Sequence, residues 1–236
     1  MRHAFALFVL AAKLTPRRLR FPLALFLANV FAFLYAISGR RRPPLRTLPE
    51  HWLAQLIGEL DTRRVPFEPR IAMTGLELLA DRGERGVLVA TTHVNAGLSR
   101  CVLRVLHDRG MAYEFLSAAP EFPICGAAQG MRPIAPSGTF LLTIRKFLRA
   151  HGIVLAMLDS AEQVTRASVA IETKEGSFWI SEPILRMAQR SGAEIVLMRG
   201  SLQHGTIAIE LERADAADDP QQLARRLGAF ALQRVA

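Results

Sequence analysis

The stretch Gly86–Asp108, GVLVATTHVNAGLSRCVLRVLHD, decides the fold expected of this chain of 236 residues. It opens with an apolar run, Val87–Ala90, that is typical of a buried strand. Beyond two threonines, apolar residues recur every three or four positions from Leu98 to Leu106, which indicates a helix. His93 therefore lies where a strand gives way to a helix.

The position of His93 suggests a function. In open α/β sheets, ligands bind in the crevice beyond the carboxyl ends of the strands. A histidine there is a candidate general base, because imidazole gains and loses a proton near neutral pH. From position alone, His93 fits equally well a structural role in capping the helix.

Strand and helix patterns alternate along the rest of the chain. We expect strands within 70–79, 113–118, 153–158, 194–198 and 207–211, and helices at 48–60, from Ser137 or Thr139 onward with Leu142, Phe147 and Leu148 facing inward, at 181–190, and from Asp219 onward. This alternation predicts a single α/β domain with a mostly parallel central sheet flanked by helices. Residues 119–138, rich in Pro and Gly, form a long connection of the kind that is often functional.

The net charge of +9 belongs to the first part of the chain. Residues 1–46 hold nine Lys or Arg and no acid, whereas in 47–236 the remaining 21 basic residues equal the 21 acidic ones. A nucleic-acid partner is not expected, because such proteins spread basic residues over a folded face with aromatics between them. Basic residues beside an apolar segment instead favour an anionic membrane surface.

Two apolar runs, 4–12 and 21–38, are separated by a proline and three arginines, and three more arginines close the second run. As a helix the second run spans about 27 Å, just short of the ~30 Å hydrocarbon core of a bilayer. We predict that 1–46 is a membrane-anchoring hairpin, embedded or in plane on the cytoplasmic side, and that 47–236 is the α/β domain. A single span, or a helical pair buried in the protein, are the alternatives. A cleaved signal peptide is disfavoured because no small-residue cleavage site is present.

The cysteine content predicts a reducing compartment. Cys101 and Cys125 lie in apolar surroundings, and their spacing indicates neither a metal site nor a disulfide. Zinc-ligand spacing, a Gly-rich phosphate loop and a GxSxG motif are also missing from the sequence.

Several short motifs occur in a familiar order. They are GVLVATTH ending at His93, Gly130-Met131-Arg132, IVLAMLD ending at Asp159, Arg166-Ala167-Ser168-Val169, and the segment Gly176–Met198. Together they resemble the bacterial lipid A late (lauroyl/myristoyl) acyltransferases, within the lysophospholipid and glycerolipid acyltransferase superfamily. The resemblance covers most of the chain, from the N-terminal apolar segment to the strand that ends near Leu211.

The resemblance implies an acyltransferase at the cytoplasmic face of the bacterial inner membrane. Its donor would be an acyl thioester on acyl carrier protein or coenzyme A, and its acceptor a hydroxyl or amine of a lipid-like molecule. His93 would be the base, and no cofactor or metal ion beyond the acyl donor is implied. Membrane lipids and acyl carrier protein would be the partners.

The chain departs from the family at one position. Five residues after the histidine, where the family has an acid that orients the imidazole, this chain has Leu98. Three explanations stay open. Asn95 or Ser99 orients His93 through a neutral hydrogen bond, or Asp159 substitutes for the missing acid. Otherwise the site is degenerate, and the protein is a lipid-binding or scaffold subunit that holds a partner.

The same motifs imply substrate contacts at Gly130, Arg132, Arg166 and Ser99. Arg132 would bind an anionic headgroup or carrier phosphate through its planar guanidinium, or else pair with a surface acid. Arg166 is otherwise a solvated loop residue. The structural alternative for Asp159 is a helix cap, the commoner role of an aspartate that follows a strand.

Overall fold

The computed structural model describes residues 2–38, 47–93, 96–117, 122–127, 130–135, 137–160, 166–173, 176–215 and 217–233. Its helices are α1 (Arg2–Leu14), α2 (Arg17–Ile37), α3 (Leu48–Thr62), α4 (Glu77–Ala80), α5 (Ala96–Asp108), α6 (Phe140–Arg149), α7 (Glu182–Arg190) and α8 (Pro220–Leu232). Its strands are β1 (Ile71–Thr74), β2 (Val87–Thr91), β3 (Tyr113–Phe115), β4 (Phe122–Pro123), β5 (Gly130–Met131), β6 (Ile153–Met157), β7 (Asp159–Ser160), β8 (Ser168–Thr173), β9 (Gly176–Ser181), β10 (Glu194–Gln203) and β11 (Thr206–Arg213).

A six-stranded sheet forms the centre of the molecule, in the order β1-β11-β10-β2-β6-β3. All of its pairings are parallel except β10 with β11, which form a long antiparallel hairpin. The prediction of a mixed α/β fold with a mostly parallel central sheet is therefore confirmed. Every residue of β2 is buried, as expected of an apolar strand covered by helices on both faces.

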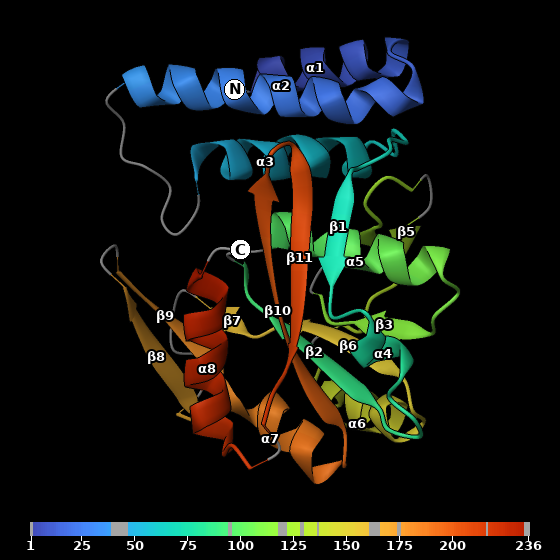
Figure 1. Cartoon of the computed structure of the whole chain (residues 1–236), viewed down its shortest axis with the longest axis vertical. Helices are drawn as coiled ribbons and strands as arrows, with labels where there is room; N and C mark the ends of the chain where they lie inside the picture. The colour runs from blue at the N-terminus through green and yellow to red at the C-terminus, as the bar shows by residue number, and fades with distance from the viewer. Residues whose placement is uncertain are drawn as a thin grey trace.

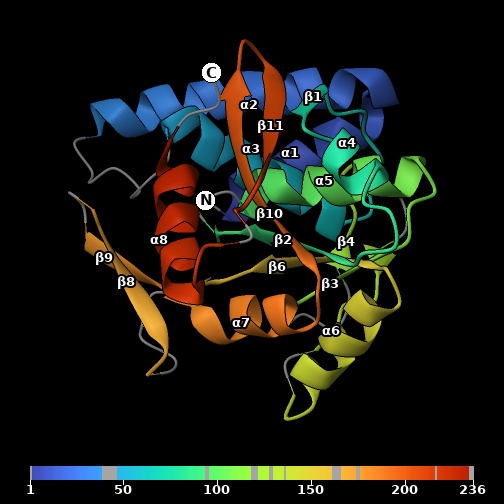
Figure 2. The same ribbon diagram turned by 60° about the horizontal axis from the view of Figure 1, so that its bottom comes forward.

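Alternate residues of the central strands face two separate cores. Val87 and Val89 belong to the core formed with α3 and α5. Leu88 and Ala90 belong to the opposite core, formed with α6, α7 and α8. Figures 1 and 2 show the helices on the two sides of the sheet and the small β8–β9 ribbon beside α8.

The two N-terminal helices lie side by side across α3 (Figure 1), so the predicted helical hairpin is present. One face of the hairpin is buried. On α2 this face consists of Phe21 followed by a stripe of small residues, Ala24, Ala28 and Ala32. Trp52 of α3 holds the hairpin in place, with ring centroids 5.6–6.4 Å from Phe5, Phe31 and Tyr35. The hairpin therefore shares a core with the α/β unit instead of standing apart from it.

The opposite face of the hairpin is apolar and exposed. The exposed large side chains on it are Leu7, Leu10, Leu14, Leu19, Phe26, Phe33, Leu34 and Ile37. Elsewhere in the described part of the chain only Leu142 and Leu232 are exposed to this degree. By length and composition, α2 is the one described helix that could cross a membrane.

The arginines between the two apolar runs also have structural roles. Helix α2 begins at Arg17, so these arginines lie within the helix and not in the connection before it. Arg20 donates hydrogen bonds to the carbonyl oxygens of Thr15 and Pro66, at 2.9 and 2.6 Å, and Arg17 lies 3.4 Å from Glu68. These contacts tie the turn of the hairpin to the connection between α3 and β1.

One local expectation is wrong, and one sheet was not predicted. Leu142 on α6 is 64% exposed, because Ile144 and Leu148 supply the buried face of that short helix. Before α7, strands β7, β9 and β8 form a second, antiparallel sheet, for which no element was predicted from the sequence. The apolar runs in this sheet, Val169–Ile171 and Phe178–Ile180, are only three residues long.

A buried carboxylate joins α3, α5 and the segment 122–127. Asp61 of α3 is 1% exposed. It accepts a hydrogen bond from Arg100 Nη1 and another from the backbone N–H of Gly126, both at 3.2 Å. Burial raises the pKa of Asp61 from 3.8 to about 6, although Arg100 and the Gly126 N–H lower it in part. Burial is thus the larger effect at this carboxyl group.

The raised pKa of Asp61 predicts a pH-dependent loss of stability. Between the unfolded value of 3.8 and the folded value of about 6, the folded state binds more protons, so the free energy of unfolding falls as pH rises. The difference corresponds to roughly 3 kcal/mol. Urea unfolding of the native protein and of Asp61→Asn, from about pH 4 to about pH 7, isolates this contribution. Parallel pH profiles for the two proteins would contradict it.

Candidate active site

His93 is positioned by the central pair of strands. In the register of β2 and β6, Thr91 is level with Met157, and His93 and Asp159 each lie two residues beyond this pair. The backbone N–H of Leu158 donates to the carbonyl oxygen of Thr91 at 2.9 Å, which continues the pairing past the end of β6. The two polar residues therefore meet at the carboxyl edge of the sheet.

One oxygen of Asp159 holds both the backbone and the ring of His93. Asp159 Oδ1 lies 2.6 Å from the backbone nitrogen of His93 and 2.9 Å from Nδ1 of its imidazole. The carbonyl oxygen of Asp159 is also 3.2 Å from Nδ1. An oxygen acceptor on this side of the ring favours the tautomer with the proton on Nδ1, which leaves Nε2 as the basic nitrogen.

The two side chains differ strongly in exposure. The imidazole is 63% exposed, whereas the Asp159 side chain is 7% exposed. A buried carboxylate that orients an accessible imidazole is an arrangement suited to general-base catalysis. The cap alternative for Asp159 fails within the described chain, because Asp159 lies in β7, opposite Ile180 of β9, and not at the start of a described helix.

Leu98 cannot be exchanged for an acid without cost. Its side chain is 4% exposed, and its Cβ lies 3.5 Å from where a Cβ on Gly200 of β10 would stand. Leu98 thus packs on the central sheet as part of the core. The position that carries the family's acid faces the interior in this chain, and the carboxylate beside His93 comes from a different strand.

The other predicted residues are less closely grouped. Arg132 is exposed and lies two residues before Ile134, which bridges Leu116 just past the end of β3, at the same edge of the sheet as His93. Gly130 pairs with Pro123 in the β4–β5 ribbon. Arg166 is exposed in the turn before β8.

The side chains of two further predicted residues, Asn95 and Ser99, lie outside the described part of the structure. Asn95 lies outside the described residues. Ser99 is within α5, but the structure describes only its backbone. The roles proposed for both stay predictions.

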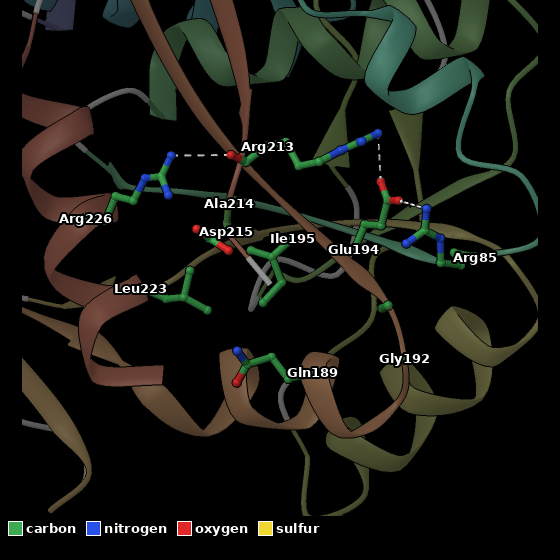
Figure 3. A pocket seen from close by; sticks show the side chains of 11 residues that line it. Arg85, Gln189, Gly192, Glu194, Ile195, Arg213, Ala214, Asp215, Leu223 and Arg226 are labelled. Carbon is green, nitrogen blue, oxygen red and sulfur yellow. Dashed lines mark hydrogen bonds and ion pairs between the residues drawn. The ribbon is translucent and has the colours of Figure 1, made fainter. Parts of the chain in front are cut away.

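A cavity of about 920 Å³ lies at the opposite edge of the sheet, where β2 and β10 begin (Figure 3). Glu194, whose side chain is 6% exposed, pairs there with Arg85 at 2.5 Å and with Arg213 at 3.3 Å. Arg226 pairs with Glu212 and Asp218. The arginines that line this cavity are thus paired with carboxylates of the protein, so the charges favour a structural role over the recognition of an anion.

The structure brings together a pair of residues that the sequence spacing did not indicate. Cys101 Sγ and Cys125 Sγ are 2.9 Å apart, and both side chains are fully buried. The spacing indicated no disulfide, and both cysteines are free thiols whose sulfur atoms are neighbours. A spacing of 24 residues carries no signal for such a contact, which arises because the segment 122–127 folds back over α5.

No protein-family model matches the chain, and a comparison with curated proteins finds no significant match. The interpretation of the site therefore rests on its geometry and on the motif resemblance described above.

The packing of Leu98 predicts that restoring the family's acid destabilises the protein. Leu98→Glu would place a carboxylate in the core, and an uncompensated buried charge costs roughly 3–5 kcal/mol. Leu98→Met, which nearly conserves volume, should cost less than about 1.5 kcal/mol. Urea unfolding of the two variants compares these costs. Equal stability of both would mean that the position can hydrate or pair a carboxylate, contrary to the packing.

Proposed function

We propose that this protein is an acyltransferase that moves a fatty acyl group from an acyl thioester to a hydroxyl or amine of a lipid-like acceptor. The observation that carries the proposal is the hydrogen bond of 2.9 Å between the exposed imidazole of His93 and the buried carboxylate of Asp159. A degenerate site would instead leave the histidine buried against apolar side chains, and the imidazole of His93 is largely exposed.

In the proposed reaction, Nε2 of His93 takes the proton of the acceptor hydroxyl or amine as that group attacks the thioester carbonyl. The tetrahedral intermediate then collapses to an ester or amide, and the sulfur leaves and takes up a proton as the free thiol of the carrier. Asp159 holds the imidazole in the tautomer that can accept this proton and stabilises the imidazolium that forms.

The contact with Asp159 compensates for Leu98 in the proposed mechanism. In the family that the motifs resemble, the orienting acid and the histidine lie on one helix. Here the acid follows β6, the strand next to β2 in the central sheet, and reaches the same ring nitrogen. Arg132, exposed at the same edge of the sheet, is suited to bind an anionic group of the donor or acceptor.

The exposed face of the α1–α2 hairpin supports a lipid-like acceptor. Eight large apolar side chains exposed on two neighbouring helices are more than a soluble protein ordinarily leaves in water. We infer that the hairpin lies in the plane of the membrane, because its buried face packs against α3, which carries charged residues such as Glu59 and Asp61. A spanning α2 would have to take α3 with it or lose this packing.

The central sheet links the site to α3, the helix on which the hairpin packs. Met198 of β10 accepts a hydrogen bond from Thr91 Oγ1, beside the site, and Leu202 donates to Glu50 in the first turn of α3. The two residues are four positions apart, or about 13 Å along the strand. The site and the helix that supports the hairpin are therefore joined through one strand of the central sheet.

The proposed roles of His93 and Asp159 predict which variants lose activity. With labelled acyl carrier protein as donor and a bacterial membrane lipid extract as acceptor, His93→Ala should lower the rate by roughly 10²–10⁴-fold. Asp159→Asn should lower it by up to about 10⁴-fold, the loss seen on removing the corresponding carboxylate in the serine-protease example. Mass spectrometry of the product would name the acceptor.

The matched control is His107→Ala, which removes an exposed histidine near the far end of α5. This variant should retain native activity. If His93→Ala forms the same product as the native protein at the same rate, His93 is not the base and the proposal fails. A folded native protein without transfer from either carrier protein or coenzyme A donors would favour the lipid-binding or scaffold alternative.

The hairpin predicts in-plane binding to membranes. Replacing Phe26 and Phe33 by serine removes two exposed rings that would enter the acyl layer, and should weaken binding to vesicles of phosphatidylglycerol and phosphatidylcholine by roughly 100-fold. Leu142→Ser, at an equally exposed position on α6, should not change it. Vesicle co-sedimentation measures both. If the bound protein resists alkaline washing and its affinity for vesicles is unchanged by the two phenylalanine substitutions, α2 spans the membrane instead.

A further inference from the structure

The pair Cys101 and Cys125 connects two segments beside the proposed site. Cys101 lies on α5, the helix that follows His93, and Cys125 lies on the segment 122–127, which precedes Gly130 and Arg132. The two sulfur atoms are 2.9 Å apart. A disulfide bond measures about 2.05 Å, so the sulfurs need to approach by less than about 1 Å to be joined.

Asp61 contacts the residues next to both cysteines, the side chain of Arg100 and the backbone N–H of Gly126. Its Oδ2 accepts from Arg100, the residue before Cys101, and its Oδ1 accepts from the N–H of Gly126, the residue after Cys125. One buried carboxylate therefore connects α5 with the segment 122–127 next to the two cysteines.

The backbone at Gly126, next to Cys125, has a conformation that only glycine adopts without strain. It has a φ of +75°, and a Cβ there would lie 2.6 Å from the carbonyl oxygen of Phe67. Only glycine fits such a conformation without strain. The segment 122–127 therefore passes close against the core, with Cys125 directed to the same interior as Cys101, where both side chains are fully buried.

The surroundings slow the oxidation of these thiols and restrict it to small oxidants. Burial, together with the neighbouring Cys101 thiol, raises the pKa of the Cys125 thiol well above its ordinary value. The thiolate that reacts with oxidants is therefore scarce, and a bulky reagent has no access to sulfurs with no exposed surface. The disulfide carries no charge and no hydrogen-bond donor, so it needs no partner in the interior.

We propose that Cys101 and Cys125 form a redox modification site, at which a small peroxide converts the two thiols into an intramolecular disulfide. One thiolate attacks a peroxide oxygen, the O–O bond breaks, and a sulfenic acid forms with release of water. The second thiol displaces the sulfenic oxygen as a second water, forming the S–S bond. Two thiols and one hydrogen peroxide thus give one disulfide and two waters.

The disulfide would staple the segment 122–127 to α5. It closes a loop that contains β3 and β4, and so restrains the connection that leads to Gly130 and Arg132. The inference does not depend on the proposed acyl transfer, because it rests on the position of the sulfurs and not on the chemistry of His93.

The test is peptide mapping of the native full-length chain. Reduced protein is treated with hydrogen peroxide in buffer without denaturant, remaining thiols are alkylated in urea, and the digest is analysed without reduction. We expect a peptide pair joined through Cys101 and Cys125 and lighter by two hydrogen atoms, which separates after reduction. The melting temperature of the oxidised protein should rise by roughly 10 °C, and reduction should reverse the rise.

The single variants Cys101→Ser and Cys125→Ser provide the control, because neither can form the bond and neither should gain melting temperature on oxidation. The native protein alone is sufficient to overturn the inference. Any of three results would contradict it. Both cysteines could still be alkylated after peroxide treatment, either of them could carry sulfinic acid, or the disulfide could join two chains. A cross-link that forms only in urea would also contradict it, since the folded geometry would then not be what joins the sulfurs.

Discussion

The pairing of β2 with β6 is the constraint on which the rest of the structure depends. Both strands are apolar and almost wholly buried, and they run parallel with Thr91 opposite Met157. Because they end at the same level, the polar residues two positions beyond each end are placed together at one edge of the sheet. The contact between His93 and Asp159 is thus a consequence of strand register, and a shift of one residue would separate the two side chains.

The packing of α5 also explains why position 98 holds an apolar residue. The helix that follows His93 must bury its face against the sheet, and Leu98 belongs to that face. An acid on the neighbouring strand avoids the conflict, since Asp159 lies past the end of β6, where the backbone leaves the core. The carboxylate is nearly buried, while the imidazole that it holds stays open to solvent.

The N-terminal hairpin meets two opposite requirements with its two faces. Small residues and Trp52 allow one face to pack closely on α3, so the hairpin is part of the folded protein. The other face presents large apolar side chains that nothing in the described chain covers. Helix α2 therefore has the buried face of a core helix and the exposed apolar face expected of a membrane-bound helix. The apolar sequence alone could not separate these two interpretations.

Local sequence determined much of the secondary structure, because the signals for it are local. The apolar run Val87–Ala90, the periodic residues of α5 and the capping box that begins with Asp219 each indicate an element from a few neighbouring residues. His93 was identified in the same way, from its place between a strand and a helix. The short strands β8 and β9 were not predicted, because their apolar runs, Val169–Ile171 and Phe178–Ile180, are only three residues long.

Only the tertiary structure decided which distant residues meet. Asp159 was one of several candidates to replace the missing acid, and its contact with His93 depends on the register of two strands 66 residues apart in sequence. The sequence spacing also did not indicate the contact of Cys101 with Cys125. Nor did it indicate the hydrogen bonds that Asp61 accepts from Arg100 and Gly126. Such contacts arise from the packing of whole elements, whose positions are set by burial over the entire core and not by the residues near any one side chain.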